Sequence, residues 1–138
     1  MFQVKEERDL FVRLVDGEDL MASLGQLGVE SGVLLAGIGM LRALRTGYWN
    51  GKNYEEHRIE EPVELLSLQG TFATSAAGRV LHAHVSVARP DGTVCGGHLL
   101  GAVVANTAEI AIRVFDELRL ERRPQPWGGE GLFPAVRR

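Results

Sequence analysis

Three of the four histidines in this chain, His82, His84 and His98, lie within 17 residues of one another. Neutral imidazole is a common metal ligand in proteins, and three imidazoles with an open fourth position are typical of a catalytic zinc shell. Nickel, copper and iron accept the same ligands. The alternative is that the three rings are separate side chains, each hydrogen-bonded to its own neighbours. Whether they converge depends on the elements that carry them.

The residues between the histidines predict a β-hairpin with a defined register. The stretch ARPDGTV, residues 88–94, places proline, aspartate and glycine at successive turn positions. This order is typical of a type I turn followed by a glycine bulge. In the register that this turn sets, Arg89 faces Thr93, and His84 therefore lies opposite His98.

The pleat of the predicted strands then places the histidines on one face. Side chains alternate with period two, so His82 and His84 point to the same side and His98 joins them from the partner strand. Cross-strand neighbours have Cβ atoms about 4.5–5.5 Å apart, so three imidazoles can meet around one point. A bulge at Gly96 and Gly97 is the alternative, and it would rotate His98 to the other face. The predicted register favours a three-histidine metal site.

Three carboxylates are candidates for a base or a fourth ligand. Glu64 and Glu109 each begin a predicted strand, where the alternative is a solvent-facing position, and Asp91 is most simply a turn residue. A serine–histidine pair through Ser86 is conceivable, but no third group orients it. The chain has no P-loop, no G-x-S-x-G motif and no H-E-x-x-H motif. The catalytic residues, and whether the protein is an enzyme, stay open.

The remaining pattern predicts an α+β fold. One main helix is expected within residues 16–32, with Asp16 or Gly17 as its cap and Gly32 near its end. Most other segments are short and β-favouring, which predicts a compact single domain with a mostly antiparallel central sheet. The strand-like runs are residues 8–15, 32–41, 44–51, 63–73, 79–88, 94–100 and 109–115.

Length, charge and cysteine content narrow the class of protein. A chain of 138 residues fits one domain, and its formal net charge of −3 disfavours binding DNA through a broad cationic face. Cys95 is the only cysteine, which excludes an intrachain disulfide and a multi-cysteine zinc site. We see neither a signal peptide nor an apolar run of about 20 residues, so a cytoplasmic location without membrane contact is expected.

Residues 119–138 differ in composition from the rest and are rich in proline, glycine and arginine. We expect a tail or an arm that wraps the body, anchored by Trp127, Leu132 and Phe133. No AT-hook is present, because no glycine lies between the arginines of ERRPQP. Its arginines could form a modest basic patch: Arg119, Arg122, Arg123, Arg137 and Arg138.

The runs GIGML, ELLSLQGTF, LHAHVSVARPDGTVCGGHLLGA and NTAEIAI, in this order, resemble the PPC domain (plants and prokaryotes conserved, DUF296), in its prokaryotic branch. The resemblance covers roughly residues 8–118, so we take residues 1–118 as the PPC-like domain and 119–138 as its C-terminal arm. It implies a compact α+β domain that assembles as a homotrimer. It also implies a metal, with zinc as the first candidate, on His82, His84 and His98. Glu64, Gly70 and Gly97 match recurrent family positions without an established role.

The sequence therefore leaves two candidate functions open. The first is a small homotrimeric metal-binding protein whose reaction and small-molecule ligand are unknown. The second is a DNA-binding or regulatory assembly module with structural histidines. The family is often called DNA-binding, but that description leans on plant relatives that add AT-hooks outside this domain.

Overall fold

The structure is a computed structural model in which residues 1–136 are described, and this part of the chain forms nine strands and one short helix. All strand pairs but one run antiparallel; the exception is a single parallel bridge between Thr74 and Glu121. The predicted single domain with a mostly antiparallel sheet and one helix is confirmed. The elements are β1 Phe2–Glu6, β2 Asp9–Val15, α1 Leu20–Gln26, β3 Gly32–Trp49, β4 Tyr54–Ile59, β5 Val63–Ser75, β6 Gly78–Ala88, β7 Val94–Val114, β8 Leu118–Pro124 and β9 Glu130–Val136.

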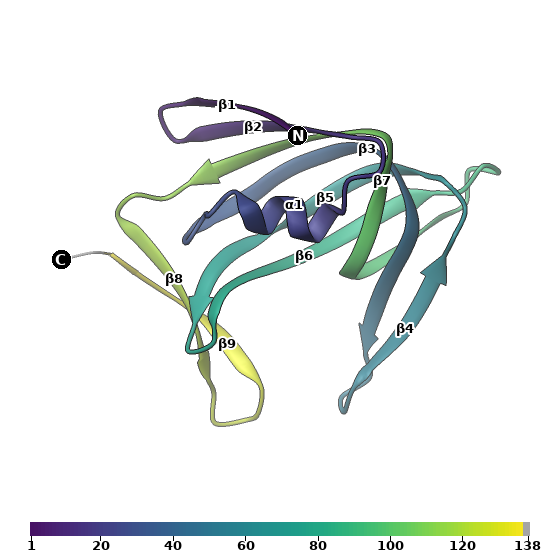
Figure 1. The fold of residues 1–138 in the computed structure, drawn as a ribbon. Helices are drawn as coiled ribbons and strands as arrows, with labels where there is room; N and C mark the ends of the chain where they lie inside the picture. Colours follow the sequence, from purple (N-terminus) through teal and green to yellow (C-terminus); the bar gives the residue numbers. More distant parts are fainter. Residues whose placement is uncertain (137–138) are drawn as a thin grey trace.

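Two long bent strands organise the sheet. Strands run in the order β1-β2-β7-β3-β5-β8-β9, β4 pairs with β3, and β6 pairs with both β5 and β7. The pairs β3–β5, β5–β6, β6–β7 and β7–β3 therefore close a ring, and β3 and β7 curve strongly within it (Figure 1). Gly39 lies at one of the register shifts in β3 with φ +141°, and a Cβ there would overlap the carbonyl of Thr107. Glycine therefore permits the close approach of β3 and β7 at this bend.

The helix closes over the apolar face of the sheet. Leu20 and Leu24 of α1 are fully buried, and so are Val12 and Leu14 of the neighbouring β2. The alternation of buried and exposed residues along β2 is the period of a strand with one face toward the core. With seven residues, α1, the one helix of the described chain, falls far short of the length that crosses a bilayer.

The helix begins and ends at other residues than predicted. Asp19 is the N-cap and its carboxylate accepts a hydrogen bond from the amide of Ala22 at 2.8 Å. Asp16, one of the predicted caps, instead binds Arg42 at 2.7 Å, which a local pattern does not reveal. The helix stops at Gln26, before Gly32, because the chain turns at Gly28 with φ +69°.

The C-terminal segment forms a regular hairpin, β8–β9, where the sequence predicted an irregular tail or arm. Leu120 of this hairpin is buried, and its amide donates to the Ser31 hydroxyl at 3.0 Å, so the hairpin is tied to the body. Trp127 does not anchor it, because this side chain at the turn is 80% exposed. The domain boundary at residue 118 stays a prediction, and Arg137 and Arg138 lie outside the described residues.

Candidate metal site

The hairpin of β6 and β7 has the register that the turn predicted. His84 pairs with His98, and the pairing continues without a shift to Ala88 and Val94. At the turn, the amide of Arg89 donates to the carbonyl of Thr93 at 2.9 Å. The alternative bulge at Gly96-Gly97 is absent from this pairing, so His98 stays on the face of His82 and His84.

Three imidazoles converge on that face. The Nε2 atoms of His82 and His84 are 3.1 Å apart, and the ring centroids of His82 and His98 are 4.8 Å apart. One nitrogen from each of the three rings lies within 4.8 Å of the others. The predicted convergence is confirmed. The opposite face of the same strands is apolar and buried, with Ala83 and Val85 in the core.

Glycines let the strands approach closely around the histidines. A Cβ on Gly96 would overlap the carbonyl of Val85, and a Cβ on Gly70 would overlap the carbonyl of His82. Gly70 is not at the register shift between β5 and β6, which lies between Leu65 and Ser67. The role of Gly70 is therefore close packing of β5 on β6, directly beside His82.

The surroundings keep two of the rings neutral. Burial, followed by the positive charges of Arg122 and the other two histidines, lowers the pKa of His82 to about 4. Burial, followed by His84 and Arg122, also lowers the pKa of His98. A neutral imidazole has the free lone pair that a metal requires.

The donor set fits a divalent transition metal. Three imidazoles on one face match a three-histidine shell with at least one open position. Within residues 1–136, the buried Nδ1 of His98 has no hydrogen-bond partner. A buried polar atom without a partner costs free energy, which a ligand bound at this nitrogen would recover.

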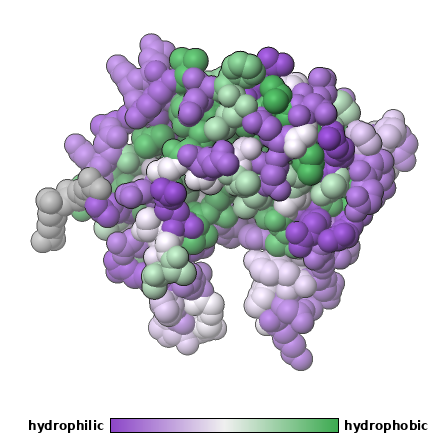
Figure 2. All heavy atoms as spheres, in the orientation of Figure 1, coloured by the Kyte–Doolittle hydropathy of each residue, from purple (hydrophilic) through white to green (hydrophobic). Residues whose placement is uncertain are grey.

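Side chains from two protruding hairpins flank the histidines. Tyr54, from the β3–β4 hairpin, stacks on His98 with ring centroids 4.8 Å apart. From the other hairpin, β8–β9, Nη2 of Arg122 donates to Nδ1 of His82 at 2.9 Å. Both hairpins protrude on the same side of the molecule (Figure 1), and the space-filling view shows a hollow between them (Figure 2).

The carboxylate candidates lie elsewhere. Glu64 and Glu109 are exposed on their strands, and Asp91 accepts from the amide of Thr93 at 2.9 Å as a turn residue does. In the described part of the chain, neither glutamate joins the histidine cluster. The hydroxyls of Ser67 and Ser86 bond to each other at 2.7 Å, so no serine–histidine pair forms here.

Sequence reasoning missed the two flanking residues. Arg122 was assigned only to a basic patch, and Tyr54 was not considered. The contact between Arg122 and His82 spans 40 residues, so no local spacing could indicate it. His57, the fourth histidine, is exposed on β4 and lies outside the cluster.

The fold and the site together define a small, mostly antiparallel β domain with one short helix and a three-histidine cluster flanked by two hairpins. The sequence model of the Plants and Prokaryotes Conserved (PCC) domain matches residues 1–116. The chain belongs to this family, and the resemblance seen in the sequence is confirmed.

Solved structures share the fold over almost the whole chain. A plant- and prokaryote-conserved (PPC) protein from Pyrococcus horikoshii is 29% identical, with a TM-score of 0.77 and 89% of each chain covered. The metal-containing protein AF0104 from Archaeoglobus fulgidus is 27% identical, with a TM-score of 0.78 and coverage of 96% of this chain and 97% of that one. A "putative DNA binding protein" from Bacteroides thetaiotaomicron has a TM-score of 0.87 and 96% coverage of both chains, but at 24% identity it supports the fold alone.

Curated relatives place a similar domain inside a larger protein. A bifunctional protein GlmU from a Synechococcus strain is 32% identical over 125 residues. The match covers 86% of this chain and 18% of that protein. The chain thus spans about a fifth of the curated relatives it matches, and their whole-protein activity is not transferred to it.

Proposed function

We propose that this protein binds one divalent transition metal per chain, with zinc as the first candidate, through His82, His84 and His98. The observation that carries this proposal is the convergence of three imidazole nitrogens within 4.8 Å, on a face fixed by an unbroken strand register. A structural relative that is described as metal-containing supports it. The cytoplasmic location expected from the sequence stays part of the same proposal.

The residues around the histidines suit a small-molecule site. A pocket of about 330 Å³ lies beside His82 and His84 and is lined by Gln69, Thr71 and Arg122. When bound, a metal with three protein ligands supplies a Lewis acid that polarises a carbonyl or activates water. The polar side chains of the pocket would bind and orient a ligand next to it. The reaction itself is not assigned.

Elemental analysis of protein purified without a histidine tag tests the proposal. We expect about one zinc per chain in the wild type after dialysis, and less than about a tenth in His84→Ala. His84 is exposed, so its removal leaves the core intact. His57→Ala removes an exposed histidine outside the cluster and should keep the full metal content. Equal metal content in wild type and His84→Ala would contradict the proposal.

A homotrimer is the assembly that we propose, as the family resemblance implies. Val4, Phe11 and Leu35 line one shallow hollow, and the first two are 73% and 54% exposed. Exposed apolar groups that share a hollow are typical of a surface covered in an assembly. Light scattering at micromolar concentration should give the mass of three chains, and a strictly monomeric mass would reject this assembly.

DNA binding is the second candidate, because the family is often called DNA-binding. Two of the described arginines of the C-terminal hairpin give it little support. Arg123 pairs with Glu121, and Arg122 points at His82. A gel shift with duplex DNA at about 50 mM salt tests whether the protein binds DNA, because phosphate contacts are strongest at low salt. We expect no shift, and a salt-sensitive shift would favour the alternative function.

A further inference from the structure

Arg122 is a cation held beside the histidines, and no acidic side chain within residues 1–136 pairs with it. Its Nη2 donates to Nδ1 of His82 at 2.9 Å and to the Thr71 hydroxyl at 3.4 Å. Its buried Nε has no hydrogen-bond partner within residues 1–136. Arg113 and Arg123, by contrast, each face a carboxylate. A partly buried guanidinium with only neutral contacts has unused capacity for an anion.

The contact between Arg122 and His82 is incompatible with a metal on the other nitrogen of the same ring. A guanidinium has donors only, so Nδ1 of His82 must accept and the ring proton lies on Nε2. That Nε2 faces His84 at 3.1 Å, and it is the atom that must present a lone pair to a metal. Ligation of the neutral ring through Nε2 places the proton on Nδ1. Two donors, from His82 and Arg122, would then face each other.

An acceptor between these two donors resolves the conflict. The adjoining pocket, about 330 Å³ in volume, is lined by Gln69, Gly70, Thr71, His82, His84, Arg122 and Leu132, none of which is acidic. The amide of Gln69 and the hydroxyl of Thr71 add neutral donors to the guanidinium. An oxyanion oxygen would accept from both Arg122 and Nδ1–H of His82, in the way that carboxylates accept from metal-bound histidines.

We propose that Arg122, with Gln69 and Thr71, forms an oxyanion subsite that binds the carboxylate or phosphate group of a small ligand when the histidines hold their metal. The subsite rests on the proposed metal function and names the class of ligand for it. Because coupling between two ligands is reciprocal, the anion should tighten metal binding by the same factor by which metal tightens anion binding.

Calorimetry on the full chain tests the subsite. Zinc-loaded protein is titrated with acetate and, separately, with methyl phosphate, at constant ionic strength in chloride. We expect one of the two anions to bind with a stoichiometry of one per chain. Binding of acetate would identify a carboxylate as the ligand's anionic group, and binding of methyl phosphate would identify a phosphate. Arg122→Gln should weaken this binding at least about tenfold, as loss of a charge-assisted hydrogen bond does, while zinc content stays unchanged. Arg122→Lys retains the positive charge, so its affinity for the anion should fall less than that of Arg122→Gln.

Arg123→Gln is the matched control, because Arg123 lies on the same strand but pairs with Glu121. It should bind zinc and the anion as the wild type does. If the wild type holds its full zinc content, two results would overturn the subsite alone. One is the same anion binding in wild type and Arg122→Gln, and the other is no binding of either anion. Absence of zinc from the wild type overturns the metal function, and the subsite with it.

Discussion

His84 and His98 face each other across β6 and β7, four residue pairs from the last pair before the turn, Ala88 and Val94. The turn fixes this pairing, since a shift of one residue would move every side chain of the strand to the other face. The position of the third histidine is thus set by backbone geometry, and changes to that geometry should affect the site.

The first prediction concerns Gly96, whose Cβ would overlap the carbonyl of Val85. We expect Gly96→Ala to lower the free energy of unfolding by roughly 2 kcal/mol or more, because backbone must shift. Urea titration of metal-free protein measures this, and zinc content should fall as well. The control is Gly25→Ala on the helix, where a Cβ meets nothing within 4 Å. It should raise stability by about 0.5–1 kcal/mol. A free energy of unfolding that does not change in Gly96→Ala would contradict the tight packing of β6 and β7.

The second prediction concerns metal removal. A ligand that binds only the folded chain adds about 2.7 kcal/mol to its unfolding free energy at 100 times its dissociation constant. We expect zinc to raise the urea midpoint of the wild type at fixed protein concentration, and EDTA to reverse this. His84→Ala should show no zinc response, whereas His57→Ala should respond fully. A zinc response that persists in His84→Ala would place the bound metal elsewhere.

The third prediction concerns Tyr54, which stacks on His98 and meets the Trp49 ring edge-on at 5.3 Å. Aromatic contacts of this kind contribute about 0.5–1.5 kcal/mol, which corresponds to a change in affinity of about two- to tenfold. We expect Tyr54→Ala to weaken zinc binding by that factor in competition titrations. Tyr54→Phe keeps the ring and should bind within about twofold of the wild type. Equal affinity in both variants would show that the stacking does not position His98.

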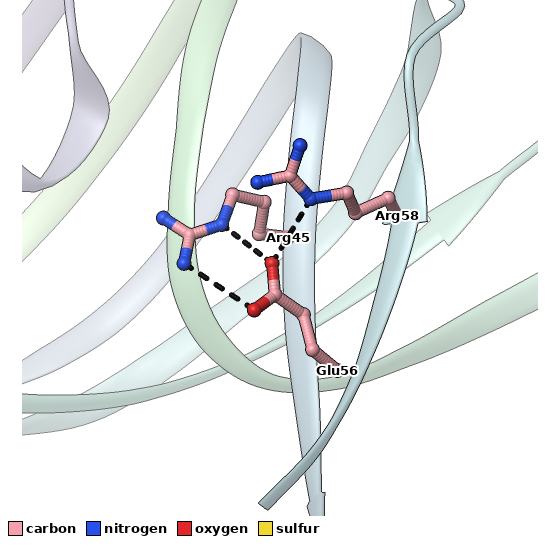
Figure 3. Close-up of polar contacts among 3 residues, drawn as sticks. All are labelled: Arg45, Glu56 and Arg58. Atoms are coloured by element: carbon pink, nitrogen blue, oxygen red, sulfur yellow. Dashed lines mark hydrogen bonds and ion pairs between the residues drawn. The ribbon is translucent and has the colours of Figure 1, made fainter.

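The fourth prediction concerns acid. Glu56 lies between Arg45 and Arg58 (Figure 3), and hydrogen bonds from these two guanidinium groups lower the pKa of its carboxyl from 4.5 to about 2. A carboxyl whose pKa is lower in the folded than in the unfolded state stabilises the folded state at pH values above its unfolded pKa. This stabilisation is lost as the pH falls through the pKa of the folded state. The group is exposed, so the effect should be small.

Comparison with Glu56→Gln isolates this group from the other carboxyls that titrate in the same range. In metal-free protein, the wild type should be the more stable of the two above pH 4.5, and its advantage should shrink as the pH approaches about 2. Urea midpoints of both proteins at several pH values measure the difference. A gap that does not depend on pH would show that these ion pairs contribute nothing to stability.

The part of the site that the sequence predicts is the part that short-range rules govern. A proline–aspartate–glycine turn has few conformations, so it fixes the register, and the strand period then places His82, His84 and His98 on one face. The apolar alternation of β2 and the presence of a single helix follow from the same local rules. The family resemblance agrees with these features but was not needed for them.

The remainder depends on contacts between distant parts of the chain. Asp16 was a reasonable helix cap, but Arg42 binds it, and the cap moves to Asp19. The regular C-terminal hairpin depends partly on pairing of β8 with β5 and on Ser31, which its own composition does not reveal. Arg122 reaches His82 only because that hairpin folds back, so its role at the site was missed.

Diffraction data on both sides of the zinc absorption edge, from crystals of zinc-loaded protein, test the central claim most directly. We predict one anomalous peak per chain, about 2.0–2.1 Å from a ring nitrogen of each of His82, His84 and His98. The contact between Arg122 and Nδ1 of His82 should be broken in the same map. Histidines bonded only to one another, with no peak between them in zinc-soaked crystals, would contradict the metal site.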